Sequence, residues 1–571
     1  MSDLKIGVYI CNCGTNIAKT VDCEAVIKAM QTLPGVAVAK SYKYMCSNPG
    51  QEMIAADIKT LGLNRVVVAA CSPRMHEPTF RKALDSAGLN PYFLEMANIR
   101  EQNSWVHEDG AACTHKAIDL TRGAVKRVAF HEALEKRSVP MSPSVLVLGG
   151  GVAGMTAALE IGDANQTVYL VEREDHLGGN VARIDLTAPH LDSARDLLLD
   201  RITRVTTHPK IKVLLKSELV EMSGYIGNFK TKIKTAGKEL ELELEVGALV
   251  VCTGYQEFDA KKIRNFGYGS LPDVITSFEL ETMIRAGKIV TKSGKTPRYV
   301  SLIHCVGSRS EEHHPYCSRV CCMTAIKYAH EVKSMIPDAY VSDLYIDMHA
   351  FGKGCEDFYK RGSELRTMFL MYKKNQPPVV RVADPKEKFG MLIALSEQLS
   401  GEDVEIPADL IVLMVGMEPR ADSASVAHIV NISRDKDGWF IESHPKLDPV
   451  ATTTDGIFIA GACQAPKDIP DSVAQARAAS ARIMAKIAQG KIWVDAVYAE
   501  VDPEYCSGCR MCNELCPYSA IEFDAAEKRS HVISAVCKAC GACVAGCPSS
   551  AIKGRHFTDK QIFAQIEGVM A

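Results

Sequence analysis

The stretch VLVLGGGVAGMTAALEIGDANQTVYLVE (Val145–Glu172) sets the architecture of the central part of this chain. A short apolar run leads directly into the glycine loop Gly149–Gly154, and an alanine-rich stretch and a second apolar run follow. Strand, GxGxxG loop, helix and second strand form a dinucleotide-binding unit, because the glycines let the backbone approach a pyrophosphate at the helix N-terminus. Glu172 lies about 20 residues further on, where a carboxylate can accept hydrogen bonds from an adenosine ribose.

Alternating strand-like and helix-like stretches continue on both sides of this unit and predict three domains. Residues 144–493 read as a doubly wound α/β domain, in which the amphipathic stretch 472–490 predicts a helix. Residues 1–136 read as a smaller α/β domain whose strands end in cysteine, and RSVPMSPS (137–144) reads as an extended linker. Residues 498–571 are dominated by CxxC motifs and form the third domain.

Composition excludes several classes of protein. The net charge is −3, and lysine and arginine are scattered, so a nucleic-acid partner is not expected. No apolar stretch approaches the roughly 18 residues that a membrane-spanning helix needs, and no signal peptide is evident, so we expect a cytoplasmic protein without a direct membrane span. The 21 cysteines of a cytoplasmic chain indicate metal ligation rather than disulfides.

The cysteines of the third domain follow the spacing CxxCxxCxxxCP twice. This duplicated spacing is typical of bacterial ferredoxins with two 4Fe-4S clusters, in which the fourth cysteine of each run binds the other cluster. The alternative is a pair of structural zinc sites. One predicted cluster is held by Cys506, Cys509, Cys512 and Cys547, and the other by Cys537, Cys540, Cys543 and Cys516.

Two later segments favour FAD over NAD as the dinucleotide. Residues 248–258 and 452–470 resemble late motifs of the flavoprotein family of thioredoxin and glutathione reductases, which implies a thioredoxin-reductase-like fold. In that family an aspartate that binds the flavin ribityl chain usually follows the glycine that corresponds to Gly461, and Ala462 stands there instead. The residues expected to bind FAD are Gly149, Gly151, Val152, Ala153, Gly154, Glu172, Arg173, Gly179, Thr253, Gly254, Gly461, Ala462, Asp468 and Ile469.

The segment 298–330 departs from the thioredoxin reductase pattern. That family carries a second GxGxxG for a nicotinamide nucleotide after a strand near Tyr299–His304, whereas this chain has HCVGSRSEEHHPYCSRVCC. A cluster at this position could exchange electrons with the flavin without hydride chemistry. Buried or redox-regulatory thiols are the alternative. The predicted ligands are Cys305, Cys317, Cys321 and Cys322.

Several strings together resemble the HdrA family, the iron-sulfur flavoproteins of the heterodisulfide reductases of anaerobes and their bacterial relatives. They include ICNCGTNI, ACSPRMHEPTF, HPYCSRVCCMTAIKYA and AGACQAPKDIPDSVAQA, followed by the double ferredoxin motif. The resemblance implies an oxidoreductase that works in a soluble complex, in which FAD receives electron pairs and splits them between a low-potential ferredoxin route and a higher-potential acceptor. This is flavin-based electron bifurcation.

The resemblance also implies partners and further site residues. The expected partners are disulfide-reducing and relay subunits of the HdrB and HdrC type, an electron-input subunit linked to hydrogenase, formate or NADH, ferredoxin, and a second copy of the chain. Lys327 becomes a candidate catalytic residue beside the reactive nitrogen of the flavin, with a surface lysine as the alternative. A further 4Fe-4S cluster is expected at Cys11, Cys13, Cys46 and Cys71, with buried structural cysteines as the alternative.

One difference from the methanogen members bears on the number of clusters. Those members carry a further ferredoxin-like insertion and a cysteine pair after the flavin-binding glycines, where this chain has DLTAPHLDSARDLLLDRITRV without cysteine. At least one of their clusters is therefore expected to be absent. The alternative function is a non-bifurcating relay subunit that binds FAD and clusters and feeds a quinone-linked or other redox partner. An NAD(P)H-dependent flavin oxidoreductase would require a second nucleotide fingerprint.

Overall fold

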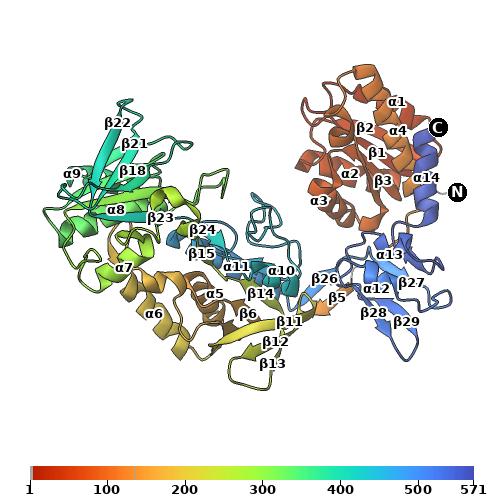
Figure 1. Cartoon of the computed structure of the whole chain (residues 1–571). Helices are drawn as coiled ribbons and strands as arrows, with labels where there is room; N and C mark the ends of the chain where they lie inside the picture. The colour runs from red at the N-terminus through yellow and green to blue at the C-terminus, as the bar shows by residue number, and fades with distance from the viewer. Residues whose placement is uncertain (1–3, 136) are drawn as a thin grey trace. The chain divides into compact units, whose positions relative to one another are not determined.

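The computed structural model describes residues 4–135 and 137–571, which form two compact units. The first unit combines Met1–Ser138 with Trp493–Ala571, and the second is Val139–Ile492. The segments predicted as separate N-terminal and cysteine-rich domains therefore belong to one unit, in which α14 (Asp559–Met570) packs along α4 (Gly110–Val128) (Figure 1). The predicted end of the first domain, residue 136, lies outside the described residues.

The N-terminal part of the first unit is a parallel sheet between helices. The strand order is β2 (Val36–Tyr42), β1 (Ile6–Cys11), β3 (Arg65–Ala70), β4 (Leu94–Asn98). Alternate residues of β1 and β3 point to opposite faces, so that Ile6, Val8 and Ile10 pack with α1 (Cys23–Gln31) and α4. Tyr9 and the opposite face of β3 pack with α2 (Asn48–Leu61) and α3 (Pro73–Ser86).

The cysteine-rich part of this unit is built as two similar halves. It contains the antiparallel pairs β27 (Ala499–Val501) with β30 (Ile552–Gly554) and β28 (Ile521–Asp524) with β29 (Arg529–Val532), and the short helices α12 (Met511–Leu515) and α13 (Ala542–Ala545). Left-handed residues recur in both halves at the same distance from the cysteines. They are Gly508 and Ala539, Arg510 and Gly541, and Ser519 and Ser550.

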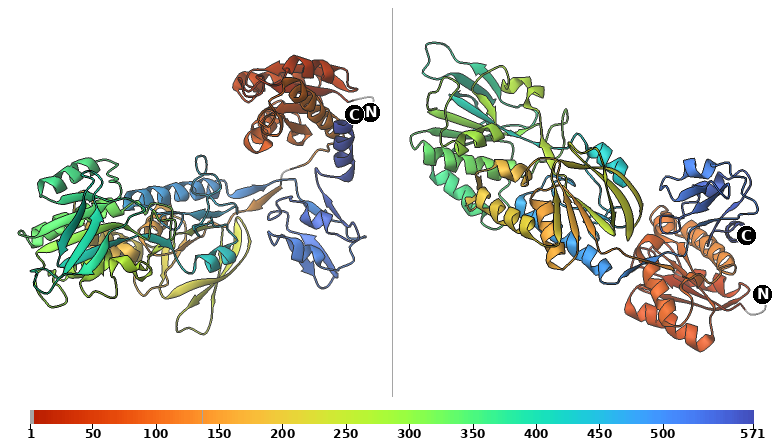
Figure 2. Two further views of the ribbon diagram at one scale, coloured as in Figure 1. Left: turned by 45° about the horizontal axis from the view of Figure 1, so that its top comes forward. Right: turned by 90° about the horizontal axis from the view of Figure 1, so that it is seen from below.

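The second unit contains two parallel sheets. The first has the order β10 (Ile211–Leu214), β7 (Val168–Val171), β6 (Val145–Leu148), β14 (Ala248–Val251), β25 (Ile457–Ile459). Helices α5 (Val152–Asp163), α6 (Ala194–Thr207) and α11 (Ile469–Ile487) and the antiparallel strands β11 (Ser217–Tyr225), β12 (Asn228–Thr235) and β13 (Leu242–Val246) pack around it (Figure 2). The predicted strand 145–148 and the predicted helix near 472–490 are confirmed.

The second sheet repeats the parallel design. Its order is β16 (Val274–Thr276), β23 (Leu410–Val415), β17 (Tyr299–Val306), β18 (Tyr340–Tyr345), β19 (Met368–Met371). Around it lie α7 (Ser277–Arg285), α8 (Cys321–Met335) and α9 (Cys355–Glu364), with the antiparallel strands β20 (Val379–Val382), β21 (Met391–Ser396) and β22 (Asp403–Ala408). Two strands, β15 (Tyr255–Glu257) and β24 (Met417–Pro419), pair between the two sheets.

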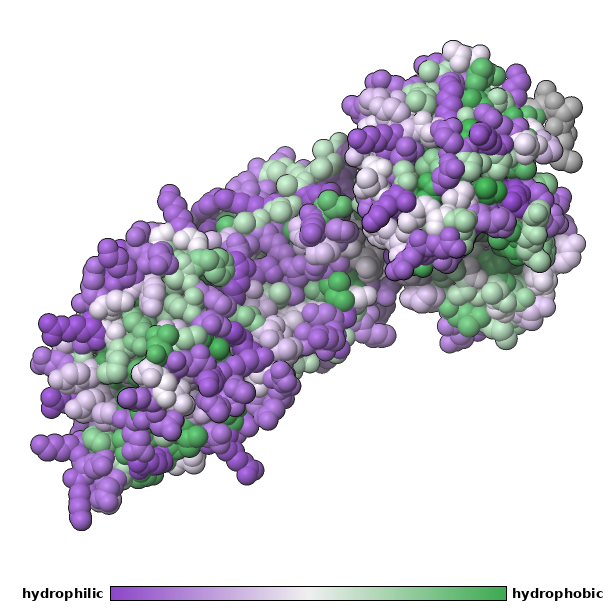
Figure 3. Space-filling view, turned by 90° about the horizontal axis from the view of Figure 1, so that it is seen from above, coloured by the Kyte–Doolittle hydropathy of each residue, from purple (hydrophilic) through white to green (hydrophobic). Residues whose placement is uncertain are grey.

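Smaller elements complete the chain. They are β5 (Arg137–Pro140), β8 (Leu186–Thr187), β9 (Asp192–Ser193), α10 (Ser423–Val430) and β26 (Lys491–Val494). Parallel sheets covered by helices confirm the predicted doubly wound α/β class. Within residues 4–135 and 137–571, no helix is long and apolar enough to cross a membrane. On the face shown in Figure 3, hydrophobic side chains lie in separate patches between hydrophilic ones.

Candidate functional site

A cavity of about 1090 Å³ opens at the carboxyl ends of β6 and β14 in the second unit. This is where doubly wound sheets bind nucleotides, because the loops after neighbouring parallel strands diverge there. Its volume exceeds the roughly 300–1,000 Å³ of most small-molecule sites, as a dinucleotide requires. Of the predicted FAD residues, those that line the cavity are Gly149, Gly151, Val152, Ala153, Glu172, Arg173, Gly179, Thr253, Gly254, Ala462, Asp468 and Ile469.

The glycine loop at one end of the cavity has the shape that a pyrophosphate needs. Gly149 has a φ of 104°, which favours glycine, and Gly151 caps the N-terminus of α5. A Cβ added to Gly151 would meet no atom within 4 Å, so the space beside it is open to a ligand. The free N–H groups at the start of α5 face the same region and attract a negative charge.

Two predicted residues, Gly154 and Gly461, act behind the cavity wall. A Cβ on Gly154 would lie 1.8 Å from the carbonyl oxygen of Gly149, so this glycine lets α5 pack directly on the loop. Gly461 has a φ of 81°, and a Cβ there would lie 2.9 Å from the Cβ of Ala153. Both glycines therefore shape the cavity without lining it.

Glu172 lies where the sequence places the ribose-binding carboxylate. Its Oε2 accepts a hydrogen bond of 2.6 Å from the backbone N–H of Gly150, and its Oε1 accepts one of 2.9 Å from the N–H of Glu174. These bonds fix the carboxylate at the end of β7. Each oxygen keeps a second lone pair that can accept a ribose hydroxyl.

Helix α8 forms another wall of the cavity and carries Lys327. The Lys327 side chain is only 2% exposed, and its ammonium pairs with Glu281 of α7 and lies 3.4 Å from Glu331. The hydroxyl of Tyr328 donates to the same Glu281 at 3.0 Å. The alternative of a surface lysine is therefore wrong, because Lys327 is a buried cation at the cavity wall.

Two carboxylates beside Lys327 had no counterpart in the sequence prediction. Glu331 follows Lys327 by four residues on α8, a helical spacing that brings side chains together and could have revealed it. Glu281 comes from a different helix, and only the fold places it here. Burial raises the pKa of Glu331 to about 7, although Lys327 opposes this shift. A carboxyl group that titrates near neutral pH can hold or release a proton next to the cavity.

The thiols of the segment 298–330 come together at the carboxyl end of the second parallel sheet. Cys305 lies near the end of β17 with a φ of 57°, and Cys321 and Cys322 begin α8. Burial raises the pKa of Cys305 to about 12, and the thiols of Cys322 and Cys317 add to this shift. The pKa of Cys321 is raised as well, by burial and by the other three thiols of the segment. Only thiols that lie near one another have such an effect. Cys321 also lines the cavity.

A buried pair supports this segment from behind. His304, next to Cys305, has its Nε2 2.6 Å from Oδ1 of Asp343 on β18, and both side chains are fully buried. Burial alone would lower the pKa of His304, but Asp343, the largest opposing influence, raises it to about 10. The imidazole is therefore a buried cation behind the thiols. Nothing in the sequence spacing indicated this pair.

The four N-terminal cysteines lie at the carboxyl edge of the first parallel sheet. Cys11 ends β1, Cys71 follows β3, and Cys13 and Cys46 lie in the loops beyond β1 and β2. Burial raises the pKa of Cys71 to about 11, and the thiols of Cys11 and Cys13 add to this shift. Parallel strands that end at one edge thus bring distant cysteines together. Arg100 donates a hydrogen bond of 3.1 Å from Nη1 to the sulfur of Cys13.

The second cysteine run of residues 498–571 lies beside the fourth cysteine of the first run. A small cavity is lined by Cys537, Cys540 and Cys543 together with Cys516 from the other run. Burial raises the pKa of Cys543 to about 11, followed by the effects of Cys537, Cys516 and Cys540. The backbone N–H of Ala520 donates to Cys516 at 3.3 Å, and that of Ala499 donates to Cys537 at 3.4 Å. Such bonds stabilise thiolates.

Comparison with known proteins assigns the cofactors of two regions. Residues 498–548 match the family of 4Fe-4S dicluster domains, which decides against structural zinc, and residues 144–204 match the family of FAD-dependent oxidoreductases. An HdrA-type iron-sulfur component of the CoB–CoM heterodisulfide reductase of Methanopyrus kandleri is 41% identical over 91% of each chain. The HdrA component of the H2:CoB-CoM heterodisulfide,ferredoxin reductase of Methanothermobacter marburgensis is 40% identical and covers 100% of this chain and 98% of its own.

This chain belongs to the HdrA family of heterodisulfide reductases. It is therefore an oxidoreductase component that carries FAD and a 4Fe-4S dicluster domain. The alignment with the M. marburgensis member of this family spans 652 positions, whereas this chain has 571 residues, so the relative contains residues that this chain lacks. Thioredoxin reductase of T. acidophilum is 15% identical with a TM-score of 0.41, covering 60% of this chain and 98% of its own, and no functional conclusion follows from a likeness at that level.

Proposed function

We propose that this chain is the electron-splitting component of a heterodisulfide-reductase-like complex. Its FAD receives electron pairs and divides them between a low-potential ferredoxin route and a disulfide or another high-potential acceptor in partner subunits. Relatives support this proposal, because the names of the M. marburgensis and Methanococcus maripaludis proteins combine a heterodisulfide with ferredoxin. The M. maripaludis name also includes H2 and formate, which supports an electron-input partner of that kind.

The observation that carries the proposal is the make-up of one cavity. Its walls contain the pyrophosphate loop after β6, the thiol of Cys321 and the ammonium of Lys327. A nicotinamide-dependent flavoprotein would have a second nucleotide loop between β17 and α8, and this chain has the four thiols there. The flavin site therefore adjoins a candidate one-electron carrier in place of a hydride donor.

The residues of the cavity have separate tasks in this proposal. The N–H groups of the Gly149–Gly154 loop bind the pyrophosphate, and Glu172 binds the ribose. Lys327 holds a positive charge at the far wall, where it stabilises negative charge on a reduced flavin. Glu331 and Glu281 pair with the ammonium of Lys327 and keep it at this wall. FAD supplies the chemistry that joins two-electron to one-electron transfer.

We further propose that all four cysteine groups hold 4Fe-4S cubes. A cube needs four thiolate ligands. Each group offers four cysteines, which either lie close enough to shift one another's pKa or share the ferredoxin spacing. Four cubes would give about sixteen irons per chain. The clusters of the N-terminal sheet and of the segment 298–330 are the ones that lie outside the matched dicluster domain.

An anaerobic redox titration with iron and FAD quantified on the same sample tests both proposals. We expect one FAD, about sixteen irons, and a single two-electron flavin transition, because a bifurcating flavin has crossed one-electron potentials. Cys321→Ala should remove about four irons, while Cys113→Ala, at a buried cysteine outside every group, should remove none. Two separate one-electron flavin steps would instead support a relay function, and only about eight irons would contradict the two additional cubes.

A further inference from the structure

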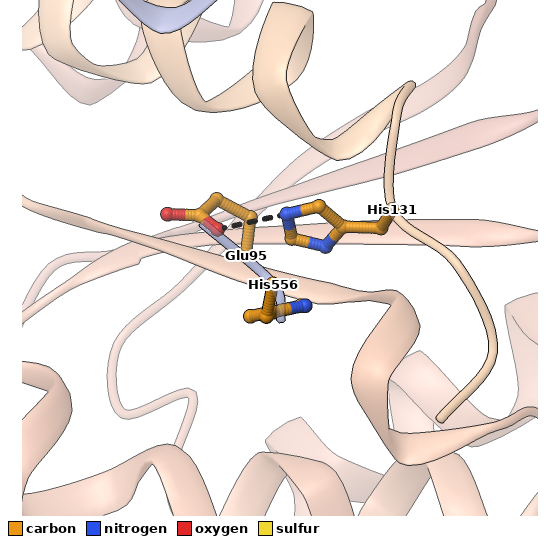
Figure 4. Close-up of side chains that lie close together, drawn as sticks. All are labelled: Glu95, His131 and His556. Carbon is orange, nitrogen blue, oxygen red and sulfur yellow. Dashed lines mark ion pairs between the residues drawn. The ribbon is translucent and has the colours of Figure 1, made fainter. Parts of the chain in front are cut away.

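Three side chains of types that can bind metals meet in the first unit, and no cysteine is among them. Glu95 lies on β4, His131 follows the end of α4, and His556 lies in the turn between β30 and α14. One ligand atom of each lies within 4.8 Å of the others. Figure 4 shows the His131 ring directed at the Glu95 carboxylate, with the His556 ring beside them. None of the three belongs to a recognisable sequence motif.

The three side chains are packed closely and shielded from water. The Nε2 of His131 lies 3.2 Å from Oε2 of Glu95. The ring centroids of His131 and His556 are 4.1 Å apart, with an angle of 49° between the rings. His131 is 1% exposed and His556 is 8% exposed. A group this small and enclosed has the dimensions of a site for one ion.

The imidazoles lack the hydrogen bonds that buried polar groups normally make. Among the described residues, Nδ1 of His131 and Nδ1 of His556 have no hydrogen-bond partner, and Nε2 of His131 faces the Glu95 carboxylate. A buried polar atom without a partner destabilises the fold, and such a cluster calls for a bound water or ion. A metal ion coordinated by both imidazoles would account for a nitrogen of each.

A guanidinium lies beside the Glu95 carboxylate. The Nε of Arg127 lies 3.5 Å from Oε2 of Glu95, and this guanidinium offsets part of the carboxylate charge. The site therefore favours an ion that binds nitrogen strongly over one that needs several carboxylates.

We propose that Glu95, His131 and His556 form a binding site for one divalent transition metal ion, most favourably Zn²⁺. Two imidazoles and one carboxylate are a recognised ligand set for Zn²⁺, with a water in the fourth position. Ca²⁺ and Mg²⁺ prefer oxygen ligands and do not match this set. Because the ligands come from β4, the end of α4 and the turn before α14, the ion would fasten the C-terminal segment to the N-terminal sheet.

Zinc titration of the holoprotein tests the proposal. Protein purified anaerobically with its clusters is treated with a chelator, and Zn²⁺ is then added while bound zinc, iron content and the thermal unfolding midpoint are measured. We expect one zinc per chain and a higher unfolding midpoint, with the iron content unchanged. Glu95→Gln and His131→Asn should each weaken zinc binding at least about tenfold. His115→Asn, at an exposed histidine on α4, is the matched control and should bind zinc as the wild type does.

The outcomes separate this site from other zinc-binding groups. Zinc that binds equally to the wild type and to both variants lies elsewhere and overturns the proposal. If a variant folds poorly, the wild-type protein still tests the proposal. A wild-type unfolding midpoint that does not rise with saturating Zn²⁺ also overturns the proposal. In that case the three side chains form a polar contact and do not bind a metal ion.

Discussion

Lys327 is a buried cation whose surroundings set two testable properties. Its ammonium lies between Glu281 and Glu331, and all three side chains are at most 5% exposed. Removing one partner of such a group leaves a buried charge without compensation, which typically costs about 3–5 kcal/mol. Lys327 also lines the cavity that we propose holds FAD, so its loss would remove a positive charge from that wall.

Lys327→Gln should therefore change both stability and redox potential. We expect the free energy of unfolding to fall by about 3–5 kcal/mol and the flavin midpoint potential to become more negative. Chemical denaturation and anaerobic potentiometry measure the two effects. Lys436→Gln, at an exposed lysine of the same unit, is the control and should change neither. A flavin potential equal to that of the wild type in folded K327Q would show that Lys327 is only structural.

Glu331 should make the free energy of unfolding depend on pH. The dependence should lie between the pKa of its carboxyl group in the unfolded chain and the pKa in the folded chain. Burial raises its pKa from the ordinary 4.5 to about 7 in the folded chain. The folded state thus holds more protons than the unfolded state in this window, and stability falls as the pH rises from about 4.5 to 7. Glu331→Gln cannot ionise, so it should lose this dependence, which amounts to about 3 kcal/mol. Thermal midpoints of both proteins at pH 5 and pH 8 test this, and parallel changes would contradict it.

At the scale of elements, the start of α5 combines two different requirements for glycine. Gly154 is needed for packing, because its Cβ would lie 1.8 Å from a backbone oxygen that cannot move aside. Gly151 leaves the cavity open, because its Cβ would meet no protein atom within 4 Å. In the proposed site, Gly154 therefore contributes to the stability of the strand–helix unit, and Gly151 contributes to the affinity for the dinucleotide.

Substitution by alanine should have different effects at Gly154 and at Gly151. Gly154→Ala should destabilise the fold, whereas Gly151→Ala should fold normally and contain much less FAD, because the added methyl group fills the pyrophosphate space. FAD absorbance and the thermal midpoint of the apoprotein distinguish the two effects. Gly390→Ala, where a Cβ also meets nothing, is the control and should retain FAD. Full FAD content in G151A would show that the pyrophosphate lies elsewhere.

At the scale of the whole molecule, the N-terminal and C-terminal segments of the chain pack against each other in the first unit. Helix α14 packs on α4 through the contact of Gly568 with Gly123, where a Cβ on Gly568 would lie 2.7 Å from the Cα of Gly123. Arg127 of α4 also donates from Nη2 to the carbonyl oxygen of His556 at 3.0 Å. The cysteine-rich segment is thereby held to the N-terminal sheet at its own C-terminal end.

Gly568→Val should loosen this packing of α14 on α4. The valine cannot fit against backbone atoms, and overpacking of this kind costs about 1–3 kcal/mol. We expect a lower thermal midpoint and faster proteolysis near residues 555–558. Glu567→Val introduces the same side chain on the exposed face of α14 and serves as the control. Equal proteolysis of the two variants would show that this contact does not hold the C-terminal helix.

Local patterns were sufficient to predict much of this molecule. Val145–Leu148, the glycine loop and the following helix form as expected, because strand propensity, glycine backbone freedom and helical periodicity act over a few residues. The cysteine spacing likewise identified the dicluster domain, which a family model confirms. In contrast, the separate N-terminal and C-terminal domains of the sequence prediction form one unit, because helix packing between distant segments leaves no local signal.

Neighbouring residues alone were enough to establish the cofactor classes and the family, since glycine loops, cysteine runs and long matching strings are local properties of the chain. The folded chain was needed to show that Lys327 is buried between Glu281 and Glu331, that His304 meets Asp343, and that Glu95, His131 and His556 converge. Each of these groups joins residues from different elements. Their proximity depends on the order and packing of strands and helices, which no spacing along the chain encodes.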